Sequence, residues 1–402
     1  MAVPVILLSL ATLAAAVVAY GVHPDWARWH HGLQLILLTR RLQWPLLSVT
    51  ILLCIALIVW MIIGRRRPWW LVGLAPVLAL LAHRFAIDPD NAFLIDDRPQ
   101  FVSPDAAPFV ADDDWVVGVM DQDDALAYPY ALLYRAPLVV QSAQESPMLL
   151  MWSAFANRAL AMRIDRSIKA RDLEIISMPA NALLIYNTRL GQFINGLTGR
   201  TMDGQKPAGF GTSIPTIKTT WKRWRALHPQ TRVLASTAAD DRGAPTQPLL
   251  PFYPMPSNTG GLPIQATVAL VATNPPVAVL DSDVAQRPTN FSDPSILVIR
   301  QRSTGSALAF DRQADNDLFP SFAAAASRKF PQAAMIDSDS ATLWTADGRA
   351  IDGPLKGKRL VEIPTDDQLY FSVMRAWYPD LRVLTPLPAS APAQPHRVGR
   401  PR

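Results

Sequence analysis

Three apolar stretches lie within the first 87 residues and predict a membrane region. Val3–Val22 is twenty residues long and carries no charge. A helix of this length, at about 1.5 Å per residue, covers a bilayer core of about 30 Å. Leu46–Ile63 is a second charge-free stretch of 18 residues. The third, 69–87, reaches bilayer length only if His83 and Arg84 extend to the far interface. We expect three spans, at about 3–22, 46–63 and 69–87, with an interfacial or core helix as the alternative for the third.

Arginines around these stretches set the predicted orientation. Arg65–Arg67 fill the short connection between the second and third stretches, and basic residues in short loops prefer the cytoplasm. The N-terminus is therefore predicted inside and everything after residue 88 outside, although residues 26–43 then place three further arginines on the outer side. That segment predicts either a surface helix on the bilayer or an ordinary connecting helix. The first stretch lacks a positive n-region, which favours an uncleaved anchor over a signal peptide.

From residue 88 the apolar runs become shorter and are bounded by turn-forming residues, as is typical of strands. Two segments predict helices, Thr219–Leu227 and Asp367–Trp377, and each is closed by a proline. Residues 235–295 hold ten prolines and predict a linker or meandering coil, and the Pro/Ala/Arg-rich tail 386–402 predicts disorder. The predicted strands are Val116–Met120, Leu173–Met178, Leu183–Tyr186, Ile296–Arg300 and Ala307–Phe310.

Two pairs of segments in the body match one another in the same order. The turn Gly199–Gly204 (GRTMDG) matches Gly348–Gly353 (GRAIDG), and His228–Leu234 (HPQTRVL) matches Tyr378–Leu384 (YPDLRVL). Two copies indicate a duplicated unit rather than a solenoid, which needs about three or more repeats. The predicted fold class is α+β, β-rich and internally duplicated, with N-terminal transmembrane helices. Its predicted divisions are a membrane region (1–87), a first α+β unit (88–234), a Pro-rich linker (235–295), a second α+β unit (296–385) and a disordered tail (386–402).

The formal net charge of +5 is unevenly distributed. Residues 1–87 hold seven Arg and one Asp, a balance of +6, and the tail 386–402 holds three Arg and no acid, a balance of +3. Residues 88–385 therefore carry a balance of −4. A nucleic-acid-binding domain needs a basic face on the folded body, so this tally argues against a nucleic-acid partner. The single cysteine, Cys54, excludes a disulfide framework and a cysteine-based zinc or iron–sulfur site.

Four residues are candidate ligand contacts. Trp221 and Trp224 lie at helical spacing, where aromatic residues more often form core than a ligand platform. Arg200 and Arg349 occupy equivalent positions in the two Gly-Arg-x-x-Asp-Gly turns, where they would bind an anion. The alternative is a plain turn, in which glycine supplies positive φ and aspartate accepts hydrogen bonds from nearby backbone. His228, the only histidine of the body, is expected at the C-terminal end of a helix, where a cationic imidazole is favoured.

Acidic runs are the remaining candidates for metal chemistry. Asp112–Asp114 and Asp121–Asp124 bracket a predicted strand, and Asp337–Ser340 is a third run. Clustered carboxylates suit Ca²⁺, but none of these runs has the spacing or glycine of an EF-hand loop. Solvated carboxylates are the simpler interpretation. The sequence contains no Walker loop, GxSxG elbow, HExxH or CxxC motif, and we predict no metal, no cofactor and no catalytic residue.

Four parts of the body carry a resemblance to a known family. They are Phe93–Ser103 (FLIDDRPQFVS), Val116–Val119 with Ala127–Pro129, Leu184–Gly204 with Thr220–Leu234, and Thr342–Leu384. In these segments the chain resembles the bacterial domain of unknown function numbered 3179, over residues 90–385. The resemblance implies an extracytoplasmic, membrane-associated domain, and it implies no established activity.

The chain departs from that family at positions able to carry chemistry. Family members usually hold a His-Glu pair and a Cys-Pro-x-Cys-Gly stretch, whose thiols and imidazole suit redox or metal chemistry. By the resemblance, the His-Glu positions are Ala136–Pro137 here, the Cys-Pro-x-Cys positions are Ser153–Ala156, and Ile194 stands in place of a tryptophan. The chain holds no cysteine after Cys54, so it lacks the reactive atoms of such a centre.

These observations predict a multi-pass protein of the cytoplasmic membrane with a large extracytoplasmic domain. The first hypothesis is a non-catalytic binding or assembly module of the cell envelope, in contact with the lipid bilayer and with another membrane or envelope protein. The second is an envelope-associated, hydrolase-like enzyme that uses carboxylates in a cleft. Two carboxylates about 5–10 Å apart, or one with a strongly raised pKa, would support it. The third is a partner or sensor subunit of another membrane protein, for which a small-residue face on the second and third spans would argue.

Overall fold

The computed structural model describes residues 2–29, 31–64, 68–86, 93–142, 146–235, 244–255, 261–285, 287–314 and 319–388. The chain divides into two compact units, each assembled from segments that are far apart in the sequence. Unit 1 comprises Met1–Val102, Tyr130–Pro215 and Leu234–Thr259. Unit 2 comprises Ser103–Pro129, Thr216–Val233 and Gly260–Arg402.

Unit 1 begins with three helices, α1 (Ala2–Tyr20), α2 (Gly32–Ile63) and α3 (Ala75–Ala86). A 3-10 turn (Pro24–Arg28) separates α1 from α2, and a longer 3-10 helix (Pro68–Leu74) runs directly into α3. The first apolar stretch is helical, as predicted. The second forms only the last part of α2, because most of the segment expected as a separate surface or connecting helix continues into it through Pro45. Leucine-rich sequence on both sides of that proline has strong helix propensity.

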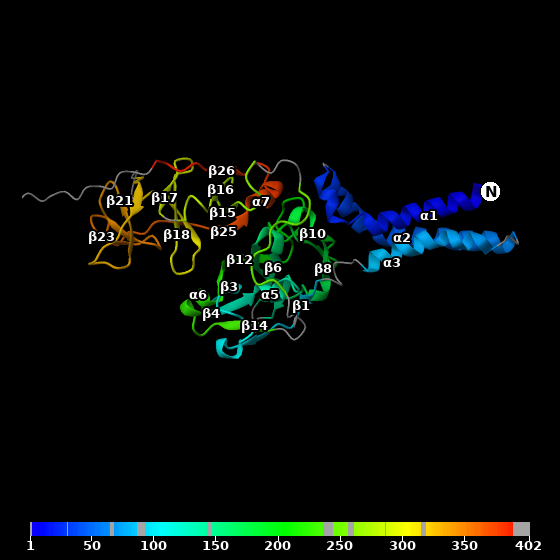
Figure 1. The fold of residues 1–402 in the computed structure, drawn as a ribbon, viewed down its shortest axis with the longest axis horizontal. Coiled ribbons are helices and arrows are strands. Elements are labelled where there is room, and N and C mark those ends of the chain that lie inside the picture. The colour runs from blue at the N-terminus through cyan, green and yellow to red at the C-terminus, as the bar shows by residue number, and fades with distance from the viewer. Residues whose placement is uncertain are drawn as a thin grey trace, which may run out of the picture. The chain divides into compact units, whose positions relative to one another are not determined.

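The helices α1, α2 and α3 lie close together (Figure 1), and small residues stand where they touch. Ala11 and Ala15 of α1 are 1 % and 0 % exposed and lie in one cluster with Val77 of α3. At the end of α1, a Cβ built on Gly21 would lie 2.4 Å from the hydroxyl oxygen of Thr39 in α2. Apolar helices without a water-driven force between them pack through such small residues, so the bundle is suited to lipid surroundings.

Two helices, Val3–Tyr20 and Gly32–Ile63, are long and apolar enough to cross a membrane, judged by length and composition alone. The core helix of a soluble protein passes the same test but is mostly buried, whereas the most apolar 18 residues of these helices are 28 % and 17 % buried. Leu71–Ala86 is a shorter apolar helix. The large apolar side chains that α2 exposes after Pro45 are Val49, Ile51, Leu52, Ile55, Ile58, Val59, Ile62 and Ile63.

The body of unit 1 is built on two sheets that share one core. The first follows the order β1-β5-β6-β7-β12, in which the β1–β5 pair is parallel, and the second is the antiparallel sheet β11-β10-β9-β8. Leu138 and Met151 of the first sheet lie in one buried cluster with Ile175 and Ile194 of the second. The elements are β1 (Ile95–Asp96), β2 (Gln100–Val102), α5 (Tyr130–Leu133), β5 (Leu138–Gln141), β6 (Met148–Ser153), β7 (Arg158–Ile164), β8 (Leu173–Ser177), β9 (Leu184–Asn187), β10 (Gln192–Asn195), β11 (Arg200–Thr201) and β12 (Phe210–Ile214).

Unit 2 contains the strand orders β13-β3-β4-β14, β25-β15-β16-β26, β17-β18-β19-β24 and β20-β21-β22-β23. Val279 and Val298 belong to one buried cluster, and Phe310 and Trp344 to another. The elements are β3 (Trp115–Asp121), β4 (Asp124–Pro129), β13 (Thr216–Thr220), α6 (Trp221–Leu227), β14 (Arg232–Ala235), β15 (Thr267–Val271), β16 (Val277–Leu280), β17 (Thr289–Asn290), β18 (Ile296–Arg300), β19 (Ala307–Asp311), β20 (Phe322–Ala324), β21 (Ala333–Asp337), β22 (Leu343–Thr345), β23 (Ala350–Asp352), β24 (Glu362–Ile363), β25 (Thr365–Tyr370), α7 (Phe371–Trp377) and β26 (Arg382–Val383).

Two of these strand sets have the same order and the same directions. In β13-β3-β4-β14 the first two pairs are antiparallel and the last is parallel, and the same holds for β25-β15-β16-β26. A short helix connects the two outer strands of each set, α6 in the first and α7 in the second. The duplication inferred from the matched segments remains a prediction. The shared strand order and the equivalent helices support it.

The structure differs from the sequence-based elements at two places. Residues 235–295, expected as a linker or coil, contain the strands β15, β16 and β17. The strands β15 and β16 are proline-free, and Pro275 and Pro276 lie in the connection between them, where proline is tolerated. The helix expected from Asp367 begins at Phe371, because residues 367–370 belong to β25, in which Leu369 and Tyr370 pair with β15. Arg65–Arg67 and most of the tail 386–402 lie outside the described residues.

Candidate functional site

The two tryptophans predicted as ligand contacts are buried in unit 2. Trp221 is 1 % exposed and Trp224 is 0 % exposed. The Trp221 backbone N–H donates to the Asp114 carbonyl at 2.7 Å, which provides a partner for a donor at the helix start. The Trp224 indole N–H donates to the Thr231 hydroxyl at 2.9 Å. Both side chains therefore act as core in this structure, the alternative that helical spacing favoured.

His228 caps the C-terminal end of α6, where it was expected. Its ring centroid lies 4.2 Å from that of Trp224. Burial lowers the pKa of His228, so the neutral imidazole is favoured over the cationic form that a helix C-terminus alone predicts. Packing against the indole outweighs the helix dipole here.

The two arginines predicted to bind anions lie on exposed turns in different units. Arg200 donates to the Gly204 carbonyl at 3.0 Å and so spans its own turn. The Arg349 backbone N–H donates to the Thr345 hydroxyl at 3.1 Å. The flanking glycines of both turns have positive φ, between 67° and 106°, which matches the plain-turn interpretation. The structure does not bring these arginines together with the tryptophans.

The acidic runs have partners in the fold. Asp112 lies 3.4 Å from Arg225, and Asp124 lies 2.7 Å from Arg232, both as exposed ion pairs. Asp337 is buried and accepts a hydrogen bond from the Trp344 indole at 2.9 Å. Within the described residues, no group of three or more His, Cys, Asp or Glu side chains is arranged to hold a metal ion.

Two segments to which the resemblance assigned a His-Glu pair and a Cys-Pro-x-Cys stretch, Ala136–Pro137 and Ser153–Ala156, lie close together in unit 1. The Trp152 backbone N–H donates to the Pro137 carbonyl at 2.8 Å. The next residue, Ser153, is 1 % exposed, and its hydroxyl oxygen accepts from the Leu183 backbone N–H at 3.2 Å. Ser153 therefore supports the backbone rather than presenting a nucleophile to solvent.

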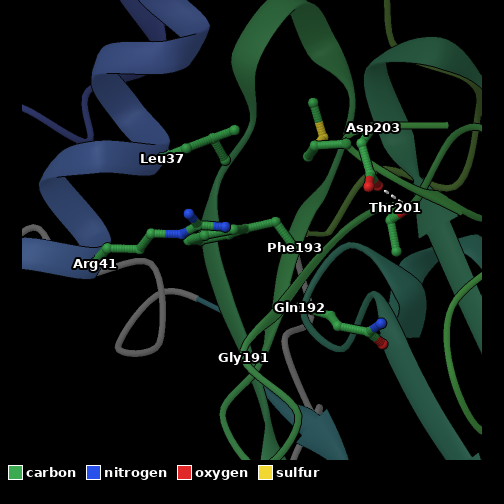
Figure 2. A pocket seen from close by; sticks show the side chains of 8 residues that line it. Leu37, Arg41, Gly191, Gln192, Phe193, Thr201 and Asp203 are labelled. Carbon is green, nitrogen blue, oxygen red and sulfur yellow. Dashed lines mark hydrogen bonds between the residues drawn. The ribbon is translucent and has the colours of Figure 1, made fainter. Parts of the chain in front are cut away.

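A pocket of about 290 Å³ lies in unit 1, where α2 meets the sheet β11-β10-β9-β8 (Figure 2). Sequence reasoning did not find this pocket, because its walls come from segments about 150 residues apart. It is lined by Leu37, Arg41, Gly191, Gln192, Phe193, Thr201, Met202 and Asp203.

Contacts of α2 with the sheet position the pocket. Ile36 is 0 % exposed and lies in a buried cluster with Ile176, Leu184 and Phe193. Four residues later, the Arg40 guanidinium pairs with Glu174 and lies 5.0 Å from the ring centroid of Tyr186. This docking holds the adjacent Arg41 among the residues that line the pocket.

The charged groups of the pocket have opposite signs. The Arg41 guanidinium carbon lies 5.3 Å from the centroid of the Phe193 ring, as a cation–π contact. The Thr201 hydroxyl donates to the Asp203 carboxylate. That hydrogen bond, helped by backbone N–H groups, lowers the pKa of Asp203. The pocket therefore presents a guanidinium and an ionised carboxylate beside an aromatic ring at neutral pH.

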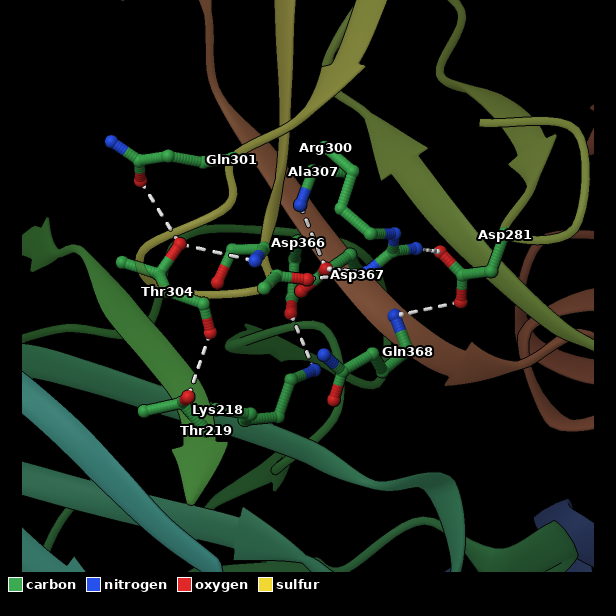
Figure 3. A network of polar contacts seen from close by, with 12 residues as sticks. Lys218, Thr219, Asp281, Arg300, Gln301, Thr304, Ala307, Asp366, Asp367 and Gln368 are labelled. Atoms are coloured by element: carbon green, nitrogen blue, oxygen red, sulfur yellow. Dashed lines mark hydrogen bonds and ion pairs between the residues drawn. The ribbon is translucent and has the colours of Figure 1, made fainter. Parts of the chain in front are cut away.

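A second polar cluster lies inside unit 2 (Figure 3). Lys218 of β13 pairs with Asp366 at 2.7 Å, and Arg300 of β18 lies 2.8 Å from Asp281 and 3.4 Å from Asp367. When all five are ionised, three carboxylates face two cations. Burial raises the pKa of Asp367 to about 6, and the Asp281 charge adds to this while Lys218 opposes it.

The backbone of this cluster is irregular. The register between β15 and β25 shifts between Val268 and Leu270, and Gln368 has φ of 58°. Its backbone N–H donates to Asp281 at 3.1 Å, and the Ala307 N–H donates to Asp367 at 2.8 Å. Bulges and left-handed residues concentrate at functional positions. Asp367 is only 5 % exposed, however, so its hydrogen bonds are made to the protein.

These features define a β-rich body joined to a bundle of apolar helices. A model of the family described as "Protein of unknown function (DUF3179)" matches residues 94–381. The chain belongs to the DUF3179 family. No curated protein and no solved structure matches it.

Proposed function

We propose that the chain is a membrane-anchored binding module of the cell envelope, with its β-rich body outside the cytoplasmic membrane. The observation that carries this proposal is the division of α2 into two parts. Before Pro45, Ile36 and Arg40 of α2 are docked on the sheet of unit 1. After Pro45, the helix exposes isoleucine, leucine and valine side chains, from Ile58 at 37 % to Ile63 at 79 %. Such a surface suits lipid and not water.

The third crossing is also part of the proposal. The 3-10 helix Pro68–Leu74 and α3 are contiguous, and at about 2.0 and 1.5 Å per residue they extend ~32 Å, enough for a bilayer core. Gly21 meets Thr39 near the start of α2, and the earlier Ala11 clusters with the later Leu53, so α1 and α2 run in opposite directions. Tyr20 meets His83 with ring centroids 5.2 Å apart. The chain thus leaves α3 at the end of the bundle where α1 ends. This arrangement supports three spans with the body on the side opposite to the N-terminus.

In this proposal the body is a duplicated α+β unit. The matched strand orders that end in β14 and β26 support the duplication. The partners of the chain are the bilayer and another envelope protein. The small residues of α1, such as Ala11 and Ala15, face its own helices, so a partner would meet the larger side chains of α2.

A hydrolase-like enzyme is a second candidate, and one observation favours it. The Asp367 carboxyl has a pKa of about 6, in the range that general acids use. Asp367→Asn would abolish activity on envelope saccharides if this candidate holds. If Asp367→Asn turns over substrate as fast as the intact chain, or if the intact chain shows no turnover, the enzyme candidate is rejected and the binding role is retained.

Fractionation and topology reporters test the anchoring. Intact protein is expected in the membrane fraction and to resist extraction by carbonate at high pH. A reporter that is active only outside the cytoplasm, fused at residue 90, is expected to be active. Recovery of the chain in the soluble fraction without detergent would contradict the anchor, and activity of a cytoplasm-only reporter would contradict the orientation.

A further inference from the structure

The pocket beside α2 has the chemistry of a phospholipid headgroup site. We propose that it binds a zwitterionic headgroup, with the phosphate at Arg41 and a primary ammonium at Asp203. Leu37, Phe193 and Met202 supply apolar walls (Figure 2). The proposal rests on the membrane anchoring proposed above, because that anchoring brings the pocket to the lipid surface.

The position of Arg41 along α2 matches the headgroup layer. Thr39 contacts Gly21, near the end of the charge-free stretch of α1 that closes at Val22. Arg41 is therefore level with the end of that stretch. The apolar run of α2 begins at Leu46, which is ~7.5 Å further along the helix axis. A headgroup layer is about 5–8 Å thick on each side of the hydrocarbon core, so Arg41 lies within it.

The charges complement a phosphate and an amine. Arg40 is neutralised by Glu174, whereas within the described residues no carboxylate oxygen lies within 4.0 Å of Arg41. A guanidinium presents several N–H donors to phosphate oxygens. On the other wall, the hydrogen bond from Thr201 keeps Asp203 ionised. A carboxylate beside the pocket disfavours headgroups that carry only negative charge.

The volume selects a small group. About 290 Å³ is at the lower end of the usual range of ligand pockets, about 300–1,000 Å³. It accommodates a headgroup and not a whole lipid. The acyl chains would continue along α2 past Trp44, whose indole is 67 % exposed at the height where aromatic side chains meet the membrane interface.

Lipid titration of the purified full chain in detergent micelles tests the site. The probes are phosphatidylethanolamine, which carries phosphate and ammonium, and phosphatidylglycerol, which carries phosphate alone; bound lipid is counted by native mass spectrometry. We expect the intact chain to prefer phosphatidylethanolamine. Arg41→Gln should weaken binding of both lipids by about tenfold, and Asp203→Asn should weaken only phosphatidylethanolamine.

Matched controls remove the same charges elsewhere on unit 1. Arg171→Gln removes an exposed guanidinium, and Asp165→Asn removes an exposed carboxylate whose pKa is also lowered by hydrogen bonds from Ser167. Both should bind lipid as the intact chain does. Arg41→Lys retains the charge and should keep most of the phosphatidylglycerol binding, which separates a charge effect from misfolding.

Equal affinity of the intact chain for both lipids would overturn the proposal, as would Asp203→Asn behaving like Asp165→Asn. The pocket variants leave the apolar helices unchanged, so they should remain in the membrane fraction. An intact chain that fractionates with membranes but shows no headgroup preference contradicts the pocket proposal and leaves the anchor standing. A chain that fractionates as soluble contradicts the anchor, while the micelle titration still reports on headgroup recognition.

Discussion

The ammonium of Lys218 lies 2.7 Å from a carboxylate oxygen of Asp366, and the Lys218 side chain is 1 % exposed. The two residues are 148 positions apart and belong to β13 and β25. A lysine buried to this extent is almost always paired. The ion pair therefore joins two outer strands of unit 2 that belong to different strand sets.

Lys218→Met should destabilise the chain by about 3 kcal/mol. Methionine keeps much of the side-chain volume but leaves the Asp366 carboxylate without its cation, and breaking a buried pair on one side costs about 3–5 kcal/mol. The 19 % exposure of Asp366 places the loss at the lower end. Urea unfolding of the full chain in detergent, followed by tryptophan fluorescence, measures it.

An exposed ion pair of the same unit provides the control. Arg232 lies 2.7 Å from Asp124, with side chains 47 % and 65 % exposed, and such pairs contribute about 0–1 kcal/mol. Arg232→Gln should therefore have little effect. Adding Asp366→Asn to Lys218→Met should recover part of the loss. Equal effects of Lys218→Met and Arg232→Gln would show that the buried pair adds no stability.

Local patterns allowed several elements to be predicted. The strand Ile296–Arg300 agrees with β18, and α6 lies within the predicted helix Thr219–Leu227. These segments combine a clear apolar period with turn or proline signals at their ends. The hairpin of β15 and β16 was missed because prolines around it dominate the window, although the strands themselves hold none.

The two polar sites depend on tertiary contacts and were not predicted. The pocket joins α2 to residues 191–203, and no local pattern relates them. For Asp367 a signal did exist. The matched segments starting at His228 and Tyr378 are offset by 150 residues, and this offset places Lys218 at Gln368, beside Asp367. If the matched segments are copies of one unit, the exchange of a cation in one copy for a neutral residue beside a carboxylate in the other is a difference that sequence reasoning can use.

The stability of the chain should fall as the pH rises through the pKa of Asp367. Its pKa of about 6 lies above the usual 3.8, so between these values the folded chain binds more protons than the unfolded chain. The contribution is fully present below about pH 4 and is lost above pH 6, with a total of ~3 kcal/mol. Denaturation midpoints between pH 4 and 7.5 measure it.

Two variants isolate this titration. Asp367→Asn keeps an oxygen for the Ala307 N–H but does not titrate, so its stability should decline less than that of the intact chain over this range. Asp293→Asn is the control, because a hydrogen bond from Arg382 lowers the pKa of Asp293. Its stabilisation is lost only as the pH falls through that lowered pKa. Parallel pH profiles for the intact chain and Asp367→Asn would rule out a raised pKa.

Gly118→Ala should destabilise unit 2 by about 1–3 kcal/mol. A Cβ at this position would lie 2.3 Å from a ring carbon of Trp224, which is 0 % exposed and cannot move aside without repacking. The contacting atoms belong to the outer ring of the indole. In a Trp224→Phe background that ring is absent, so adding Gly118→Ala should cost less. A double-mutant cycle measures this coupling, and additive effects would contradict the close contact.

Glu174→Gln should loosen the docked part of α2. The Arg40 side chain is 12 % exposed and its guanidinium pairs with Glu174, so removing the carboxylate leaves a largely buried cation, at a cost of about 1–3 kcal/mol. Trypsin cuts after arginine only where the helix opens locally. Cleavage at Arg41 should therefore be faster in Glu174→Gln than in the intact chain.

The reciprocal exchange and an exposed pair complete this experiment. Arg40→Glu combined with Glu174→Arg restores opposite charges at the same positions and should slow cleavage at Arg41 again. Asp25→Asn removes an exposed pair with Arg28, in which both side chains are 48 % exposed, and should leave cleavage unchanged. If Glu174→Gln and Asp25→Asn are cut at the same rate, apolar contacts around Ile36 alone hold α2 on the sheet.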